Sequence, residues 1–227
     1  VTAIEVSPAD PTVVWAGSNG GDLLVTDTEG EEWTLLDRSQ LANRYISDIA
    51  ASYSNPRTAW IAYSSYSTKN VWKTTDLGET WTSLWDGMPD VPVSSIEVHP
   101  DDENIIFIGT DIGVFATFDG GKSWVEYGKG LPRSPVLDIK LSTTFGVVRV
   151  GTHGRGIWEA PLVTSAPSAP SITAPTGGDV FRGTLTTTLA WSGFSGRVRI
   201  EFSPNNGEQW IPVASSISAS AYRWKVP

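Results

Sequence analysis

Short runs of alternating apolar and polar residues recur along residues 1–160 at a nearly constant interval. The runs are centred on isoleucines spaced 45, 47 and 43 residues apart, namely Ile4, Ile49, Ile96 and Ile139. Alternation of this kind is typical of a half-buried β-strand. Each isoleucine is followed by a second apolar run, at residues 13–17, 59–63, 105–109 and 147–151, and a third, at residues 23–26, 71–74, 114–117 and 157–160. In the first three units a tryptophan opens a fourth run, at Trp33, Trp81 and Trp124.

This repeat predicts an all-β fold built from β-propeller blades. Four short strands in each stretch of about 45 residues match the period of a propeller blade. Residues 1–162 hold three units of four strands and a fourth unit of three. We expect about four blades that form the C-terminal part of a larger propeller, with missing blades or another chain at the open edges. A closed four-blade ring is the alternative. The second-strand residues Trp15, Trp60, Phe107 and Val148 are expected to pack between blades.

The turn between the third and fourth strands carries the most specific motif, S/T-x-D-x-G-x-T/S-W. In unit two it comprises Thr74, Asp76, Gly78, Thr80 and Trp81, and in unit three Thr117, Asp119, Gly121, Ser123 and Trp124. The aspartate can accept hydrogen bonds from the backbone of its own turn, glycine can adopt the left-handed conformation, and tryptophan can pack beneath. Unit one is degenerate, with Thr28 in place of the aspartate. We interpret these residues as structural.

These turns resemble the Asp-boxes, or BNR-type repeats, of sialidases, sortilin-type propellers, xyloglucanase-type glycosidases and many secreted bacterial propellers. The resemblance covers residues 1 to 162. It implies blade architecture and a secreted or cell-surface location. It implies little about activity, because Asp-boxes in those families lie away from the ligand-binding face.

A second, smaller domain is predicted after a break in the repeat. Residues 163–171 are rich in proline, serine and alanine and read as a linker. Residues 172–227 contain alternating runs like those of a sandwich, and they resemble part of an immunoglobulin-like or fibronectin-like module. A complete sandwich of that kind needs about 100 residues. We therefore expect the chain to be cut at both ends.

Composition excludes several classes of function. The chain has no cysteine and two histidines, His99 and His153, which argues against thiolate chemistry, a metal site and a histidine-based catalytic relay. Its net charge is −9 with no basic run, which argues against nucleic-acid binding. No apolar stretch is long enough to span a membrane. No cofactor motif is present in context, so we expect no cofactor.

Candidate ligand residues must come from the face opposite the motif turns. That face holds the loops between second and third strands and the loops between blades. The candidates are Arg44, Tyr45, Tyr66, Asp86, Asp111, His153 and Arg155. Exposed aromatic rings suit stacking on sugars or peptides. His153 and Arg155 lie in a glycine-rich run that also reads as a tight structural turn.

Two functions remain open. The first is a non-enzymatic extracellular or cell-surface module that presents a propeller face to protein or carbohydrate. The alternative is the C-terminal part of a secreted glycoside hydrolase, sialidase- or xyloglucanase-like, whose catalytic carboxylates lie in missing blades. Glycoside hydrolysis usually needs two facing carboxylates, and we assign no catalytic residue within this chain.

Overall fold

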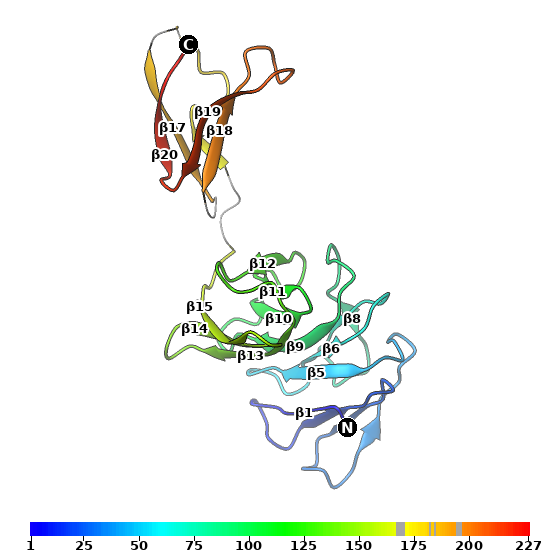
Figure 1. The fold of residues 1–227 in the computed structure, drawn as a ribbon. Helices are drawn as coiled ribbons and strands as arrows, with labels where there is room; N and C mark the ends of the chain where they lie inside the picture. Colours follow the sequence, from blue (N-terminus) through cyan, green and yellow to red (C-terminus); the bar gives the residue numbers. More distant parts are fainter. Residues whose placement is uncertain (167–170, 182, 184, 194–196) are drawn as a thin grey trace. The chain divides into compact units, whose positions relative to one another are not determined.

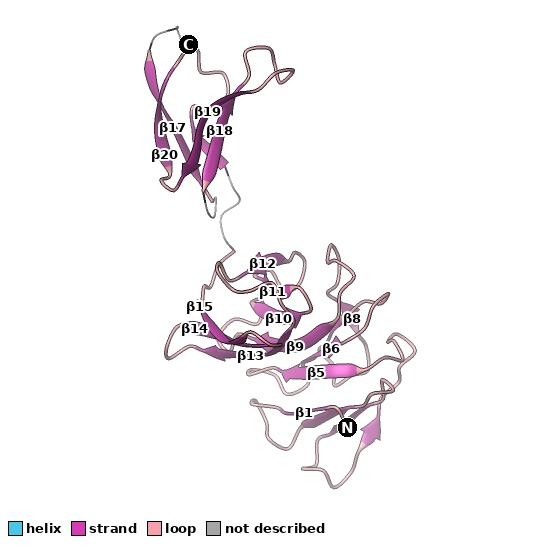
Figure 2. Cartoon of the chain, in the orientation of Figure 1, coloured by secondary structure: helices cyan, strands magenta, loops and turns pink. Residues whose placement is uncertain are grey.

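The computed structural model describes residues 1–166, 171–181, 183, 185–193 and 197–227. Every regular element in these ranges is a β-strand (Figure 2), which confirms the all-β prediction. The chain divides into two compact units, residues 1–166 and 167–227. The expected linker, residues 163–171, spans this division, and its residues 167–170 lie outside the described part of the chain.

The first unit consists of four antiparallel sheets that follow one another in chain order (Figure 1). The first sheet, blade 1, is β1 (Ala3–Val6), β2 (Val14–Gly17), β3 (Leu23–Thr26) and β4 (Thr34–Leu35). Blade 2 is β5 (Ile46–Ala51), β6 (Ala59–Tyr63), β7 (Val71–Thr74) and β8 (Thr82–Ser83). Blade 3 is β9 (Val93–Val98), β10 (Ile106–Thr110), β11 (Gly113–Thr117) and β12 (Val125–Tyr127). Blade 4 is β13 (Val136–Ser142), β14 (Val147–Thr152) and β15 (Gly156–Pro161).

The predicted propeller blades are confirmed, with two corrections at the level of single strands. Each fourth strand begins one residue after its tryptophan, because the tryptophan belongs to the preceding turn. Val148 packs between blades as expected, since it is fully buried in the cluster that holds Phe107 and Ile139, but its alignment with Trp15, Trp60 and Phe107 is wrong. In the sheet register Arg149 of blade 4, not Val148, takes the position of Trp15, Trp60 and Phe107. The reason is a turn between β13 and β14 that is one residue shorter than in the other blades.

Each blade has two faces that pack differently. We call the side that bears Trp15, Trp60 or Phe107 the forward face, and the side that bears Ile49, Ile96 or Ile139 the receiving face. The forward face of each of the first three blades packs on the receiving face of the next, and each contact forms one apolar cluster. The first strands of the blades therefore lie side by side in chain order. Alternation along every strand produces this arrangement, because successive side chains point to opposite faces.

The second unit contains two small antiparallel sheets. One is β16 (Ser171–Ala174), β17 (Thr186–Ser192) and β20 (Ala221–Lys225), and the other is β18 (Val198–Phe202) and β19 (Ile211–Ile217). Apolar side chains of both sheets line a cavity of about 380 Å³. Phe202 and Trp224 meet across it, with ring centroids 5.2 Å apart. This is the partial β-sandwich expected from the alternating runs.

Candidate functional site

The motif turns lie at the same end of the strands as the loops between first and second strands. In blade 2 the amide of Leu77 donates to the carbonyl of Arg57 at 2.8 Å. In blade 3 the amide of Gly120 donates to the carbonyl of Asn104 at 3.0 Å. We call this end of the first unit the turn end. The connections between second and third strands, and those between blades, lie at the opposite end, which we call the loop end.

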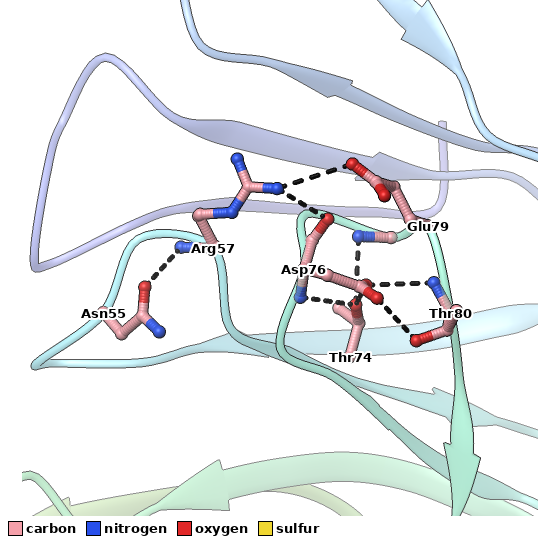
Figure 3. Close-up of polar contacts among 7 residues, drawn as sticks. Asn55, Arg57, Thr74, Asp76, Glu79 and Thr80 are labelled. Atoms are coloured by element: carbon pink, nitrogen blue, oxygen red, sulfur yellow. Dashed lines mark hydrogen bonds and ion pairs between the residues drawn. The ribbon is translucent and has the colours of Figure 1, made fainter.

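Hydrogen bonds within the turn explain why the motif has its residue types. Figure 3 shows Asp76 accepting from the Thr80 amide at 2.9 Å and from the Thr80 hydroxyl at 2.5 Å. The Thr74 hydroxyl accepts from the Gly78 amide at 3.0 Å. Gly78 has φ +88°, and a Cβ there would lie 2.3 Å from Leu36 Cδ1, so only glycine fits. Arg57 reaches over the turn to the Asp76 carbonyl at 3.1 Å.

The same geometry recurs at the other motif turns. Asp119 accepts from the amide and hydroxyl of Ser123 at 2.9 and 2.5 Å, and the Thr117 hydroxyl accepts from Gly121 at 2.9 Å. In blade 1 Thr28 substitutes a hydroxyl for the carboxylate and accepts from the Glu32 amide at 3.0 Å. In the second unit the side-chain oxygen of Asn205 takes the place of the carboxylate and accepts from the Gln209 backbone amide at 2.8 Å.

Charge in these turns is stabilised locally. Hydrogen bonds from the Thr80 hydroxyl and amide lower the pKa of Asp76 to about 2. For Asp119 partial burial raises the pKa, but hydrogen bonds from Ser123 and Thr117 outweigh it and also bring the pKa to about 2. Each of the two carboxylates accepts three hydrogen bonds, and all three come from its own turn. The geometry gives the motif residues a structural role.

The motif tryptophans connect each turn to the preceding blade. Trp81 is 6% exposed and stands edge-on to Trp15 of blade 1, with centroids 6.4 Å apart. The indole N–H of Trp124 donates to the carbonyl of Leu84, in the segment after blade 2, at 2.7 Å. Trp33 of blade 1 has no preceding blade in this structure and is 41% exposed.

Three of the predicted ligand residues lie at the loop end on three different connections, and the side chains of two of them, Tyr66 and Asp111, are in contact. The Tyr66 hydroxyl, between β6 and β7, donates to Asp111 Oδ2, between β10 and β11, at 3.2 Å. Tyr45 precedes β5, and its carbonyl accepts from the Ser64 amide at 3.1 Å. Tyr45 and Tyr66 are 43% and 57% exposed as whole residues. We call these three residues the Tyr66 surface.

Neighbouring polar contacts hold the Tyr66 loop in place. The Asn70 side chain donates to the carbonyls of Ser65 and Val91, both at 2.7 Å. The Ser67 amide donates to Asp90 Oδ1 at 2.6 Å. Lys69 Nζ lies 3.7 Å from Asp86 Oδ1. The β6–β7 loop is thus tied to the segment between blades 2 and 3, so Tyr66 is presented from a supported loop.

Among the described residues, the remaining candidates make no side-chain hydrogen bond or ion pair with Tyr45, Tyr66 or Asp111 themselves. Asp86 contacts Lys69 as described, and the Arg44 guanidinium donates to the adjacent Asn43 carbonyl at 3.1 Å. Within the described residues no hydrogen bond or ion pair links the side chains of His153 or Arg155 to the Tyr66 surface. Instead the Trp158 indole donates to the Arg155 carbonyl at 2.8 Å, a contact that belongs to the turn itself.

Reasoning from the motif turns and loops missed a group of charged residues on the first strands. Lys140 Nζ lies 3.2 Å from Glu97 Oε2, and Asp48 Oδ2 accepts from the Ile96 amide at 2.9 Å. Glu5 of β1 lies near the same group. Burial raises the pKa of Glu5 to about 7, with Glu97 and Asp48 adding repulsion and Lys140 opposing it. The repeat could have indicated this group, because a charged residue directly follows the central isoleucine in three units, as Glu5, Glu97 and Lys140.

This raised pKa makes the stability of the protein depend on pH. Between the ordinary value and about 7 the folded state binds the Glu5 proton more tightly than the unfolded state does. Stability therefore falls as the pH rises through this window. We expect Glu5→Gln to match the wild type at pH 4 and to exceed it at pH 8 by on the order of 1 kcal/mol, a figure reduced for solvent screening. Urea denaturation at the two pH values measures this. Equal stabilities at pH 8 would contradict the assignment.

No three His, Asp or Glu side chains gather as a metal ion would require in the described ranges. The described part of the chain also contains no helix that could cross a membrane.

Comparison with solved structures finds several chains of similar fold, among them GH74 enzymes. It is similar to an ancestral GH74 enzyme, at TM-score 0.57 and 14% identity, over 96% of this chain and 32% of that structure. It is similar to the GH74 xyloglucanase from Xanthomonas campestris, at TM-score 0.53 and 15% identity, over 94% of this chain and 37% of that structure. It also matches the computationally designed Ika4 protein, at TM-score 0.52 and 14% identity, over 71% of this chain and 91% of that structure.

These likenesses are likenesses of fold. The chain spans about a third of the length of the GH74 structures that it matches. Neither protein-family models nor curated protein sequences give a match. The fold of the chain is therefore that of an all-β protein with propeller blades like those of the GH74 β-propeller enzymes.

Proposed function

We propose that this chain is a glycan-contacting section of an extracellular β-propeller of the glycoside hydrolase type. The observation that carries the proposal is the Tyr66 surface, where two exposed tyrosine rings and a carboxylate come from three connections at the loop end. A sugar ring offers apolar C–H faces and a rim of hydroxyl groups. Tyrosine rings can cover such a face, and a carboxylate accepts hydrogen bonds from hydroxyl groups.

The comparisons favour the hydrolase hypothesis over a free-standing protein-binding module. The solved structures that match most of this chain include a xyloglucanase, and we take xyloglucan as the ligand class to test. We also identify the motif turns as Asp-boxes, which agrees with an extracellular or bacterial cell-surface location. In this proposal the second unit is an immunoglobulin-like or fibronectin-like module that accompanies the propeller.

Within this chain the proposed role is binding, not bond cleavage. A glycosidase needs one carboxylate that donates a proton and a second that acts as base or nucleophile. Three carboxylates of the loop end contact neighbouring groups: Asp90 accepts from the Ser67 amide, Asp86 lies near Lys69, and Asp111 accepts from the Tyr66 hydroxyl. In the proposal these residues shape and orient the surface, and hydrolysis depends on residues outside these blades.

Titration calorimetry of the 227-residue protein with xyloglucan oligosaccharides tests the proposal. We expect Tyr66→Ala to weaken binding by about tenfold, which corresponds to about 1.4 kcal/mol. Tyr66→Phe keeps the ring and loses only the contact to Asp111, so its effect is expected to be smaller. Tyr53 is the control, because it is also exposed, at 45% against 57% for Tyr66, but lies at the turn end.

Two results would contradict the proposal. One is the absence of heat with xyloglucan oligosaccharides at millimolar concentration for the wild-type protein. The other is an equal loss of affinity in Tyr53→Ala and Tyr66→Ala, which would show that the binding is not located at the loop end.

A further inference from the structure

The receiving face of blade 1 is an apolar surface without a partner. Ile4, Val6 and Leu35 on this face are 64%, 49% and 62% exposed. The equivalent isoleucines of the other blades, Ile49, Ile96 and Ile139, are at most 3% exposed, because the preceding blade covers each of them. The closed four-blade ring therefore does not form, since blade 4 does not cover this face.

At the motif turn on the same face, blade 1 again differs from blades 2 and 3. In blades 2 and 3 the glycine of the motif turn packs against a leucine of the preceding blade's connection, Leu36 for Gly78 and Leu84 for Gly121. At the corresponding Gly30 of blade 1 a Cβ would meet Trp33 alone among the described residues, and Trp33 itself is 41% exposed. From the first strand to the turn tryptophan, the receiving side of blade 1 thus carries the apolar residues that a neighbouring blade covers in blades 2 and 3.

The three filled interfaces show what covers such a surface. Each covering sheet places a large aromatic residue from its second strand into the interface, Trp15, Trp60 or Phe107, and all three are fully buried. Two covering sheets also supply a side-chain acceptor to the backbone of the receiving isoleucine. Asp48 accepts from the Ile96 amide at 2.9 Å, and Ser95 accepts from the Ile139 amide at 3.1 Å.

The chain's own far face does not have these properties. On the forward face of blade 4 the position of the aromatic residue is taken by Arg149, which lies 2.6 Å from Glu159 and stacks on Phe145. Lys140 lies on the same face and contacts Glu97. Burying these charges against Ile4 and Leu35 would cost free energy. Head-to-tail association of two copies of this chain is thus disfavoured.

We infer that the receiving face of blade 1 is an interface for one further propeller blade, a four-stranded sheet with an aromatic residue on its second strand and a side-chain acceptor before its central isoleucine position. The inference rests on the blade packing alone and is independent of sugar binding. It defines a partner by its chemistry and assigns it a single position, in register with β1.

The chain itself supplies a suitable test partner. Blade 2 already covers blade 3, and Val1 is equivalent to Val93 because Ile4 is equivalent to Ile96. Residues 46–92 placed directly before Val1 therefore reproduce the natural spacing. The protein has no cysteine, so Ile4→Cys creates a single thiol whose labelling rate reports the exposure of this face.

We expect the thiol at position 4 to react rapidly in the 227-residue chain and to react about tenfold more slowly, or slower still, when the extra blade is attached. Two controls accompany it. Ile157→Cys, on the forward face of blade 4, should stay reactive in both proteins. Trp60→Glu made only in the attached copy should restore rapid labelling at position 4, since a charge cannot be buried there.

Three results would overturn the inference. The first is unchanged labelling at position 4 after the blade is attached. The second is unchanged protection when the copied tryptophan is replaced by glutamate. The third is slow labelling in the 227-residue chain together with a dimer in sedimentation velocity, which would make a second copy the occupant.

Discussion

Replacing Trp60 with alanine is expected to lower the free energy of unfolding by about 3–5 kcal/mol. Trp60 lies on the forward face of blade 2, is fully buried, and packs against Ile96 and Ile108 of blade 3. Lys73 Nζ lies 4.6 Å from the centre of its ring and adds a cation–π contact. Removing the indole leaves a cavity that the two flanking sheets cannot close, because each is held by its own hydrogen bonds.

Two further variants make this expectation specific. Trp60→Phe should cost much less, about 1.5 kcal/mol or below, since Phe107 occupies the equivalent position of blade 3. Trp33→Ala removes a partly exposed tryptophan and should also cost less than Trp60→Ala. Urea denaturation followed by circular dichroism measures all three. If the two alanine variants lost the same stability, the assignment of Trp60 to the core between blades would be wrong.

Replacing Asp76 with alanine is expected to cost about 1–3 kcal/mol at pH 7, because the amide and hydroxyl of Thr80 lose their acceptor. The pKa of Asp76 is lowered from its ordinary value to about 2. A carboxylate with a lowered pKa stabilises the fold above the unfolded value, and this contribution is lost as the pH falls toward 2. The difference between wild type and Asp76→Ala should therefore shrink between pH 4 and pH 2.

Asp86→Ala is the control for Asp76, since Asp86 is exposed and makes one long ion pair with Lys69; we expect a change within about 0.5 kcal/mol. Asp76→Ala should not alter the contacts of Tyr66, because Asp76 lies at the turn end. Reduced xyloglucan binding by Asp76→Ala with unchanged urea denaturation would show that the turn contacts ligand, against the geometry described above.

The sequence predicted the blades well because their information is local. Alternation around each isoleucine determines which side chains face a neighbouring blade, and Asp76 and Gly78 form their turn from contacts within it. The misplacement of Val148 has the opposite origin. A single residue missing from the β13–β14 turn shifts the register and exchanges the two faces of the strand, and no feature of the apolar run itself reveals this.

The candidate site was predicted only in part, because it depends on contacts between loops. Tyr66 and Asp111 are 45 residues apart, and nothing in either loop alone indicates that they meet. Tyr63, three residues before Tyr66, is by contrast fully buried. The charges of Glu5, Asp48 and Glu97 come together because the first strands lie side by side, a consequence of blade packing.

Strand pairing in the first unit joins only strands that are neighbours in the chain, and no strand is exchanged between blades. Thermodynamically such a unit behaves as a short linear array, in which the total stability is the sum of four blade contributions and three nearest-neighbour coupling energies. Blades 2 and 3 take part in two couplings each, whereas blades 1 and 4 take part in one. Cooperativity is therefore concentrated in the middle of the array, and its ends are the elements from which local unfolding can begin.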